Sequence, residues 1–397
     1  MNIQIGHDAA LIESKKKLVS GTYLHNAWYV AAWADELAGG KIIGRTFLNE
    51  PVAIYREGNG KLIALDNRCP HRFAPLSMGQ VIDGNRIQCP YHGLEFDGTG
   101  ACVLNPHGNK HISSRLRVKT YPVIEKHNAI WIWMGDKAPD PSKVPDFSVM
   151  DNVPELHSTK RDKIMIKANV ELIIDNLLDL SHTAYLHNGI LGNASTVESD
   201  IEVTQDGDSV TVSRYAKNCE PPGMNKMMWP EVPDVVDKFS FIKWMAPSTL
   251  KLLAGICLPG KEPESGSGYH AIHLLTPETD HTTHYFFTAI RFGVYSKGDE
   301  LNRQIQEKVA ATRRFAFEEQ DAPVIEAQQR FIDASQSAMD PVMLAIDAGP
   351  VRYKQVLKKL IAAKRPPGRV NESRHRRLGV FGDPRIILSP CKSFSRD

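Results

Sequence analysis

The sequence predicts an α+β protein in which an all-β domain is followed by a domain that combines an antiparallel sheet with helices. Three observations support this prediction. Residues 25–135 consist of short β-type runs separated by turn residues. The segment 138–155 has four prolines among its eighteen residues, which is typical of a linker. Beyond this segment, helical patterns are segregated from a series of strand patterns, as in α+β proteins.

Length and composition indicate an ordinary soluble globular protein. A chain of 397 residues has room for about two or three domains. Hydrophobic residues make up 42% and charged residues 24%, which excludes extensive disorder. No run approaches the ~20 apolar residues of a membrane helix, and the N-terminal residues lack the apolar segment of a secretion signal. We therefore expect a cytoplasmic protein with no membrane partner. The formal net charge of +2 is too balanced for a nucleic-acid-binding protein.

The first domain is predicted over residues 22–137. In the run PVAIYREGNGKLIALDN, the turn residues Gly58-Asn59-Gly60 separate two alternating segments, and NAIWIWMG at 128–135 is a further β-type run. Residues 138–155 are the predicted linker.

The second domain is predicted over residues 156–363. It begins with a helical pattern at 169–187 and ends with helices at 299–332 and about 350–363. Strand patterns lie between them, near 200–215, 239–258, 270–276 and 283–294. Residues 364–397 carry nine Lys and Arg against three acidic residues and have little apolar periodicity. We predict that they form a basic tail that is flexible or not native to the fold.

Two cysteine–histidine pairs form the strongest motif in the chain. Cys69-Pro-His71 is followed, after seventeen residues, by Cys89-Pro-Tyr-His92. Zinc sites more often pair Cys with Cys and His with His, whereas a Rieske [2Fe–2S] cluster needs two Cys on one iron and two His on the other. The flanking prolines and Gly93 suit tight loops around a cluster. The spacing therefore predicts a Rieske cluster, with structural zinc or coincidence as the alternatives. The other cysteines are interpreted as buried or idle thiols; they are Cys102, Cys219, Cys257 and Cys391.

A second group of ligand-type side chains lies in NVELIIDNLLDLSHTAYLH, residues 169–187. On an ideal helix, Asp175, Asp179 and His182 share one face, and a polar stripe on so apolar a helix should meet a compensating group such as a metal. His187 lies ~140° away from His182 on that helix. Both can reach one metal only if the helix ends or widens between them. Two His and one carboxylate form the facial triad of non-haem Fe(II) oxygenases.

The carboxylate of such a triad must come from elsewhere in the chain. The segment RFAFEEQDAPVIEAQQR offers Asp321, with Glu318 and Glu319 as rivals. Spacing alone leaves the three open, and Asp321 also suits the start of a helix before Ala-Pro.

With these motifs, the chain resembles the oxygenase component of Rieske non-haem iron oxygenases over roughly residues 22–363. Asn176-x-x-Asp179-x-x-His182-x₄-His187 matches the catalytic signature of that family. The resemblance implies a helix-grip catalytic domain. It implies that the cluster is held by Cys69, His71, Cys89 and His92, and the mononuclear Fe(II) by His182, His187 and Asp321. It further implies that Asp179 links the two metal centres and that Asn176 supports the iron ligands.

Within this family the chain is most similar to vanillate and dicamba O-demethylases, in HLLTPETDHTTHYFF (273–287) and in the final DPVMLAIDAGPVRYKQVLKKLIAA. That branch implies a homotrimer, O₂ as co-substrate and electrons from a flavin- or ferredoxin-type reductase. The reductase would oxidise NADH, because this chain lacks a dinucleotide-binding fingerprint. We expect monooxygenation or demethylation of an aromatic substrate. The alternatives are a ring hydroxylase or cis-dihydroxylating dioxygenase and, more remotely, a non-catalytic Rieske electron carrier.

Two features are candidates for contact with the substrate. His273 could bind an acidic group of the substrate or be a strand histidine with ordinary partners. The stretch NKMMWPEVPDVVDKF (225–239) could line an apolar pocket or belong to the core.

Overall fold

The structure is a computed structural model that describes residues 2–293 and 298–364. Residues 365–397, which make up nearly all of the predicted basic tail, lie outside the described residues. The chain begins with a helix that the sequence analysis did not predict, α1 (Asn2–Leu18).

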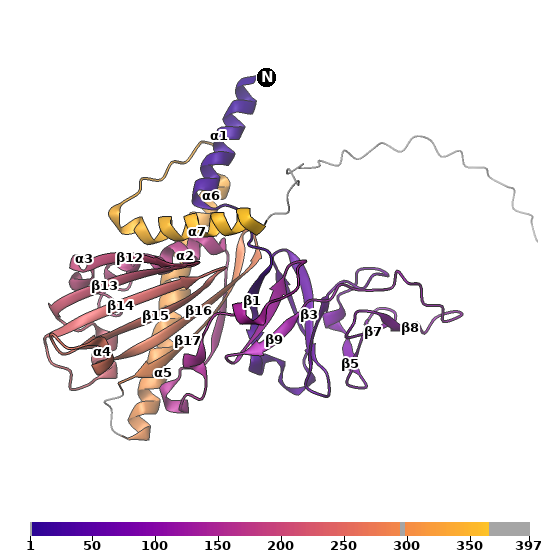
Figure 1. Cartoon of the computed structure of the whole chain (residues 1–397), viewed down its shortest axis with the longest axis horizontal. Coiled ribbons are helices and arrows are strands. Elements are labelled where there is room, and N and C mark those ends of the chain that lie inside the picture. Colours follow the sequence, from indigo (N-terminus) through magenta and orange to yellow (C-terminus); the bar gives the residue numbers. More distant parts are fainter. Residues whose placement is uncertain (1, 294–297, 365–397) are drawn as a thin grey trace, which may run out of the picture. The chain divides into compact units, whose positions relative to one another are not determined.

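The first domain consists of three small antiparallel sheets (Figure 1). The sheet nearest the second domain has the order β1-β10-β9, with β1 (Ala27–Trp33), β10 (Ala129–Met134) and β9 (Val123–Lys126). The next contains β2 (Ile43–Phe47), β3 (Glu50–Arg56) and β4 (Leu62–Asp66). The third contains β5 (Gln80–Ile82), β6 (Arg86–Gln88), β7 (Glu95–Asp97) and β8 (Cys102–Leu104). The predicted all-β domain is confirmed.

The second domain is built on a seven-stranded antiparallel sheet with the order β11-β17-β16-β15-β14-β13-β12 (Figure 1). The strands are β11 (Asp162–Ile166), β12 (Asp200–Asp206), β13 (Ser209–Cys219), β14 (Val236–Met245), β15 (Thr249–Cys257), β16 (Ser267–Thr279) and β17 (Thr282–Phe292). All neighbours except β11 and β17 follow one another in the chain, so the sheet is largely a meander. The α+β prediction is confirmed.

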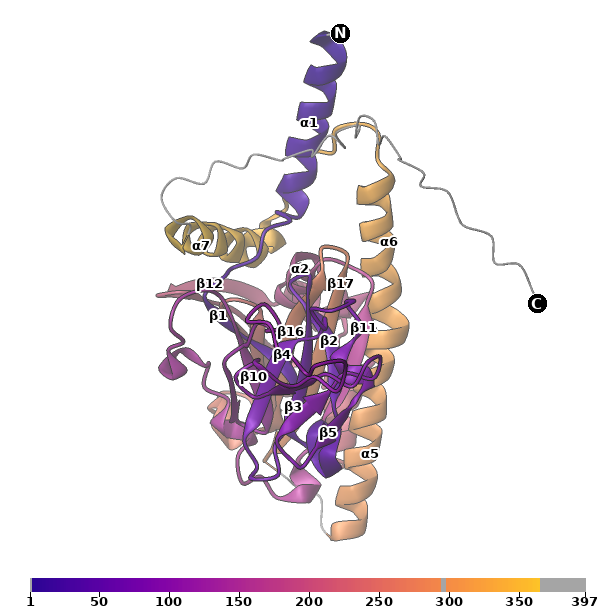
Figure 2. The same ribbon diagram turned by 90° about the vertical axis from the view of Figure 1, so that its right-hand side faces the viewer.

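Helices cover this sheet. They are α2 (Val170–Leu178), α3 (Ala194–Glu198), α4 (Gly223–Met228), α5 (Asp299–Phe315), α6 (Ala322–Ala334) and α7 (Ala348–Lys364). A π-helical segment, Ala316–Asp321, joins α5 to α6, and Figure 2 shows the two helices running end to end along one side. Pro323 lies in the first turn of α6 and has no amide hydrogen for the preceding turn, which is consistent with the irregular winding there.

The predicted helix over residues 169–187 is wrong in its second half. Helix α2 begins after Asn169, whose side chain caps the Glu171 amide, and it ends at Leu178. Asp179 leaves the helical region, and its carboxylate accepts a hydrogen bond from the Ser181 amide at 2.9 Å. A short 3₁₀ turn, Leu180–Ala184, follows. The local capping by Asp179 therefore ends the helix before either predicted iron-binding histidine.

The two domains share part of one hydrophobic core. Trp28 and Trp131 of the first domain pack in the same cluster as Leu274 and Phe286 of the second, and all four are at most 2% exposed. The Thr276 hydroxyl of β16 also donates a hydrogen bond of 2.6 Å to a carbonyl of β1. Burial of large aromatic side chains at this contact favours a fixed domain arrangement.

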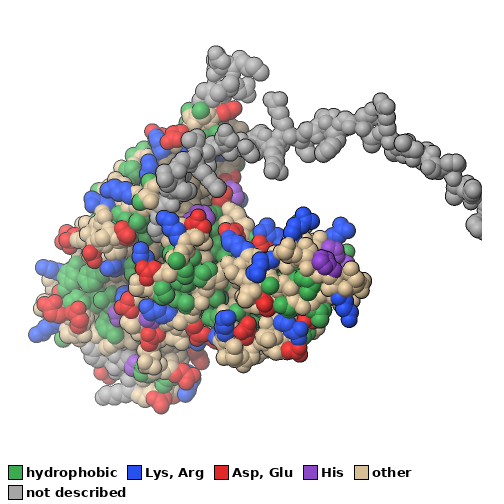
Figure 3. All heavy atoms as spheres, turned by 45° about the vertical axis from the view of Figure 1, so that its right-hand side comes forward, with side chains coloured by type: hydrophobic (Ala, Val, Ile, Leu, Met, Phe, Trp, Pro, Cys, Tyr) green, Lys and Arg blue, Asp and Glu red, His purple; other side chains and the backbone are tan. Residues whose placement is uncertain are grey.

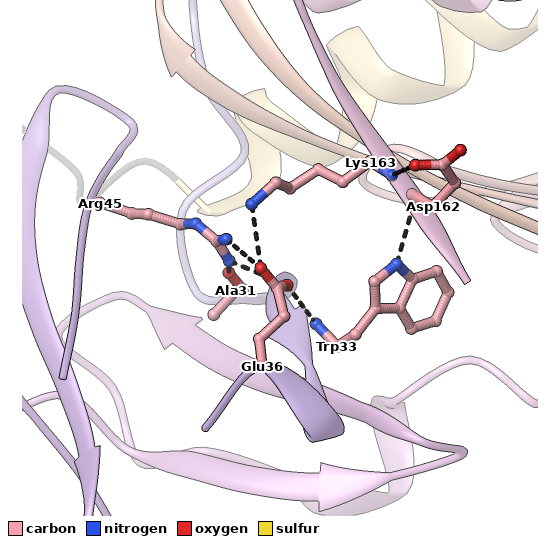
Figure 4. Close-up of polar contacts among 6 residues, drawn as sticks. All are labelled: Ala31, Trp33, Glu36, Arg45, Asp162 and Lys163. Carbon is pink, nitrogen blue, oxygen red and sulfur yellow. Dashed lines mark hydrogen bonds and ion pairs between the residues drawn. The ribbon is translucent and has the colours of Figure 1, made fainter. Parts of the chain in front are cut away.

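A polar cluster around Glu36 reinforces the same contact (Figure 4). The Glu36 carboxylate accepts hydrogen bonds from Arg45 and from the Trp33 amide within the first domain. It also pairs with Lys163 of β11 at 2.9 Å. The Trp33 indole donates to the Asp162 carbonyl at 2.9 Å. Glu36 thus connects Lys163 of the second domain with Arg45 and Trp33 of the first.

Candidate active site

The two cysteine–histidine loops have the same backbone hydrogen bonding. In each loop the cysteine amide and carbonyl both bond to residues four or five positions later. These bonds, of 2.8–3.0 Å, join Cys69 to Ala74 and Phe73, and Cys89 to Leu94 and Gly93. Phe73 and Gly93 occupy equivalent positions and both have positive φ, 59° and 67°. The tight loops predicted from the flanking turn residues are therefore present, as a matching pair.

The loops bring their four predicted ligands together as an inner and an outer pair. Cys69 and Cys89 are 1% exposed, and their thiols lie within hydrogen-bonding reach of each other. Burial raises the pKa of Cys69 to about 11. The ring centroids of His71 and His92 are 4.5 Å apart, with His71 exposed. Two adjoining thiols and two adjoining imidazoles fit a cluster that takes Cys on one iron and His on the other.

The histidine pair lies at a basic surface of the first domain. Histidine and Lys or Arg side chains gather there in Figure 3. Arg72 follows His71 directly, and the Lys110 amide bonds to the carbonyl of His107, whose ring bonds to the His92 carbonyl. Both cations are exposed, and so are the aromatic rings of Phe73 and Tyr91, at 73% and 64%. This surface offers an anionic protein both charge and apolar contact close to the cluster ligands.

In the second domain, His182, His187 and Asp321 come together as one potential metal site. One ligand atom from each lies within 4.8 Å of the others. The carboxylate oxygen of Asp321 is 3.1 Å from His187 Nε2 and 3.5 Å from His182 Nε2. Two imidazoles and one carboxylate grouped in this way fit the facial arrangement that Fe(II) takes in non-haem oxygenases.

The other ring nitrogen of each histidine is occupied, which aims Nε2 at the site. His182 Nδ1 bonds to the main-chain carbonyl of Asp179, and His187 Nδ1 bonds to Gln320 Oε1 at 2.8 Å. Gln320 in turn donates to the Leu186 carbonyl at 2.8 Å. Such partners fix the ring orientation and tautomer of metal-binding histidines. Sequence reasoning missed Gln320, although it stands next to the predicted carboxylate.

The position of Asp321 follows from the π-helical segment in which it lies. Asp321 is 4% exposed, and Asn176 donates a hydrogen bond of 3.2 Å to its carboxylate. Its rivals face elsewhere, because Glu318 pairs with Arg314 at 2.7 Å and Glu319 is exposed. The structure thus groups Asp321, with Asn176 beside it, and leaves both glutamates outside the site.

The family resemblance implies that Asp179 links the two metal centres, but within this chain its carboxylate makes no hydrogen bond with His182, which bonds to the Asp179 main-chain carbonyl instead. Asp179 Oδ1 accepts from the Ser181 amide and lies 3.7 Å from the guanidinium of Arg214. The other acid of the predicted stripe, Asp175, binds Lys354 of α7 at 2.7 Å. The stripe is broken because the helix ends at Leu178.

The pKa values of the two histidines shift in opposite directions. Burial lowers the pKa of His182, and the charge of Asp321 offsets this only in part. Burial also lowers the pKa of His187, but the hydrogen bond and charge of Asp321, together with the hydrogen bond to Gln320, outweigh burial, so the pKa of His187 is raised. A bound cation requires both rings to be neutral and would oppose that protonation.

A cavity of about 930 Å³, its open mouth included, adjoins the three grouped residues. Apolar and aromatic side chains dominate its wall; among them are Leu177, Leu180, Phe239, Ile242, Leu252 and Phe317. Phe239 and Asn225 come from the stretch 225–239, whose Met228 lies in the core instead. His273 lines the cavity, is 2% exposed and bonds through Nδ1 to the Tyr285 hydroxyl at 2.6 Å. Its Nε2 has no hydrogen-bond partner among the residues that the structure describes.

Both domains match known protein families. Residues 27–122 match the Rieske [2Fe-2S] domain family, and residues 166–363 match the vanillate O-demethylase oxygenase C-terminal domain family. The chain belongs to the Rieske non-haem iron oxygenases, as an oxygenase component of the branch that includes the vanillate and dicamba O-demethylases. It is therefore an enzyme, and the electron-carrier and structural-zinc alternatives are dropped.

Relatives of the whole chain support this assignment. The oxygenase component of chloroacetanilide N-alkylformylase from Rhizorhabdus wittichii is 34% identical over 87% of this chain and 97% of its own length. The oxygenase component of dicamba O-demethylase from Stenotrophomonas maltophilia is 36% identical over 85% and 98%. A crystal structure of dicamba monooxygenase bound to 3,6-dichlorosalicylic acid superposes with a TM-score of 0.79 at 34% identity, covering 87% of this chain and all of that one. Among the described residues, no helix has the length and apolar character needed to cross a membrane.

Proposed function

We propose that this oxygenase uses O₂ and electrons from a separate reductase to monooxygenate an alkyl group on an aromatic substrate, with loss of that group. The supporting observation is the cavity beside His182, His187 and Asp321, whose wall is mainly apolar and carries the rings of Phe239 and Phe317. An aromatic ring is well accommodated by such a wall. Relatives named as O-demethylase and N-alkylformylase components point the same way.

In this proposal Cys69, His71, Cys89 and His92 hold the Rieske cluster, because they form the adjoining thiol and imidazole pairs described above. The mononuclear iron is held by the three residues grouped in the second domain, His182, His187 and Asp321. When bound, the cluster supplies single electrons and the iron supplies the oxygen chemistry.

The protein contributes orientation and exclusion of water. Gln320 holds the His187 ring, and Asn176 holds the Asp321 carboxylate, so the ligand atoms face one point. The apolar wall excludes bulk water from that point. His273 Nε2, which has no hydrogen-bond partner in the described part of the chain, contacts the bound substrate. Insertion of one oxygen atom into a methyl C–H bond would give a hemiacetal from an O-methyl group or a carbinolamine from an N-methyl group, and either releases formaldehyde. The other oxygen atom of O₂ would leave as water, with two electrons from the reductase and two protons.

The electrons come from a separate protein that contacts the first domain. An NADH-oxidising flavin- or ferredoxin-type reductase docks at the basic surface around His71 and His92. The chain assembles as a homotrimer in which Asp179 connects the cluster of one subunit with the iron of its neighbour. The domain limits are 22–137 and 156–363, and the protein works in the cytoplasm in the catabolism of aromatic compounds.

A substrate panel with added reductase tests the proposed reaction. Methoxy- and N-methyl-substituted aromatic compounds are incubated with the iron-loaded enzyme, NADH, reductase and O₂. We expect formaldehyde in a 1:1 ratio to the dealkylated product. Ring-hydroxylated or cis-diol products without formaldehyde would instead identify the alternative ring hydroxylase or dioxygenase.

A further inference from the structure

One buried cation on the cavity wall, Arg313, has no polar partner among the residues that the structure describes. Arg313 lies in the last turn of α5 and is 3% exposed. Its guanidinium makes no ion pair or hydrogen bond, and Nη2 is shielded from solvent without an acceptor. The next residue, Arg314, has the ordinary arrangement, because it pairs with Asp162 and Glu318 at 2.7 Å each. A buried, unpaired guanidinium is strongly unfavourable unless a ligand pairs with it.

Aromatic rings hold the Arg313 guanidinium in place. Its Cζ lies 5.6 Å from the centroid of Phe287 and 5.3 Å from that of Phe317. Phe317 also lines the cavity and packs edge-on against His273, with ring centroids 5.7 Å apart. Rings against the guanidinium face leave its N–H edges available for a ligand.

Apart from Asp321, the other charged groups of the cavity wall are also cations. Lys238 bonds to the Thr196 hydroxyl at 2.6 Å and pairs with no acidic residue in the described part of the chain, and Arg214 faces Asp179 at 3.7 Å. Among the described residues, Asp321 is the one carboxylate that lines the cavity, and it belongs to the grouped metal ligands. The cavity therefore carries an excess of positive charge away from the metal site.

We propose that Arg313 binds an anionic group of the substrate, a carboxylate or a sulfonate, and so makes this enzyme selective for aromatic acids over their neutral analogues. The planar guanidinium matches either anion with two parallel hydrogen bonds. This inference rests on the proposed function and adds to it the chemical class of the substrate.

Arg313 and Asp321 lie eight residues apart on one continuous run of helix, formed by α5 and the π-helical segment, and both line the cavity. The proposed anion site and the grouped metal ligands are therefore two separate points on the same cavity wall.

Binding to the iron-loaded enzyme under anaerobic conditions tests the proposal without turnover. The probes are 4-methoxybenzoate, 4-methoxybenzenesulfonate and the neutral isostere 4-methoxybenzamide, with Kd measured by calorimetry. We expect the wild type to bind at least one of the acids about 10-fold or more tightly than the amide. Arg313→Met should remove that preference and leave amide binding unchanged. Arg313→Lys should retain part of it.

Matched controls separate this role from others. Arg314→Met removes a neighbouring cation outside the cavity and should keep the preference, and Lys238→Met should also keep most of it. The Tm of Arg313→Met without ligand should equal or exceed that of the wild type, because the change removes an unpaired buried charge.

Three results would overturn the proposal. The first is that the wild type binds the amide as tightly as both acids, and the second is that the preference for the acids is lost in Lys238→Met but not in Arg313→Met. The third is that Arg313→Met loses acid and amide binding equally and has a lowered Tm. Failure of the proposed function is distinct from these. It would show as Arg313-dependent binding of the acids without formaldehyde from any methoxy or N-methyl substrate.

Discussion

The cluster loops and the iron site differ in how far apart their ligands lie in the chain and how deeply they are buried. The cluster loops span residues 69–94, repeat one hydrogen-bonding pattern and place His71 in solvent. The iron site joins residues that are separated in the chain by six of the sheet's seven strands, β12 to β17, and His187 and Asp321 are 1% and 4% exposed. A local, exposed site suits contact with a protein that delivers electrons, whereas a buried site assembled over long range suits substrate chemistry in a closed cavity.

Cys69→Ser gives the largest expected effect, and it separates the two centres. Loss of one thiolate should abolish the cluster, its visible absorption and its EPR signal, and thereby all turnover. The mononuclear iron should remain, because its ligands lie in the other domain. Cys102→Ser is the control, since this buried thiol donates to the main-chain carbonyl of Leu104 and is not one of the four predicted cluster ligands. A Cys69→Ser protein that keeps the cluster signal would contradict the assignment.

Asp321→Ala should have the opposite effect to Cys69→Ser, with loss of the mononuclear iron and retention of the cluster. The mononuclear iron should fall to background while the cluster spectrum stays intact, because only the carboxylate of the three grouped ligands is removed. Iron analysis together with EPR of the cluster measures both centres in one preparation. Glu318→Ala and Glu319→Ala are matched controls on the same helix. If one of them empties the iron site and Asp321→Ala does not, the proposed ligand is wrong.

Asp179→Asn tests whether the two centres communicate through this carboxylate. We expect the cluster and most of the iron to remain, while reoxidation of a pre-reduced cluster slows by about 100-fold or more. Single-turnover kinetics with substrate and O₂ measure that rate. Asp175→Asn, one turn earlier and bound to Lys354, should retain the wild-type rate. An unchanged rate of cluster reoxidation in Asp179→Asn would show that the Asp179 carboxylate only accepts the Ser181 amide hydrogen bond and caps the following turn.

Gln320→Ala should weaken the iron site without removing a ligand. The His187 ring loses its Nδ1 partner, so we expect iron affinity to fall by about 10- to 100-fold. Competition with a chelator measures this affinity, and the exposed neighbour Glu319→Gln serves as the control. Equal iron affinity in both variants would show that packing alone orients the ring.

The smallest expected effect is at the domain contact, and it depends on pH. Burial of the Glu36 carboxyl raises its pKa, but Arg45 and Lys163 outweigh burial and lower the pKa from 4.5 to about 2. Because the folded-state pKa is depressed, the stabilisation is complete above about pH 4.5 and is lost as the pH falls toward 2. Glu36→Gln should therefore reduce the free energy of unfolding by about 1 kcal/mol at pH 7, a modest value because water screens the partly exposed pairs.

Urea unfolding at several pH values measures this difference. The gap between wild type and Glu36→Gln should narrow steadily below about pH 4.5. Glu125→Gln removes an exposed ion pair with Arg56 in the same domain and should have little effect at any pH. A gap that stays constant down to pH 3 would show that the lost interaction is not the ion pair.

Local patterns in the sequence were sufficient for the fold class and for the cluster loops. Strand alternation and the apolar periodicity of 299–332 depend on residues within a few positions of one another, and the structure has strands and helices where these patterns predict them. The two cysteine–histidine pairs could be recognised because each pair lies within one turn-forming loop.

The tertiary structure decided the features that depend on contacts between distant residues. The choice of Asp321 over Glu318 required a π-helical segment and a hydrogen bond from Asn176, 145 positions away. The early end of α2 at Leu178 was missed because apolar periodicity continues beyond it, whereas Asp179 caps the next turn. Arg313 lies in the last turn of α5, where a cation is ordinarily favourable, and only the packed structure shows that it lines the cavity without a polar partner among the described residues. Periodicity in the sequence indicates which face of a helix or strand is apolar. The groups that pair with a buried charged side chain come from distant parts of the chain. Whether such a side chain is buried, and what it pairs with, is therefore decided only when the helices and strands pack together.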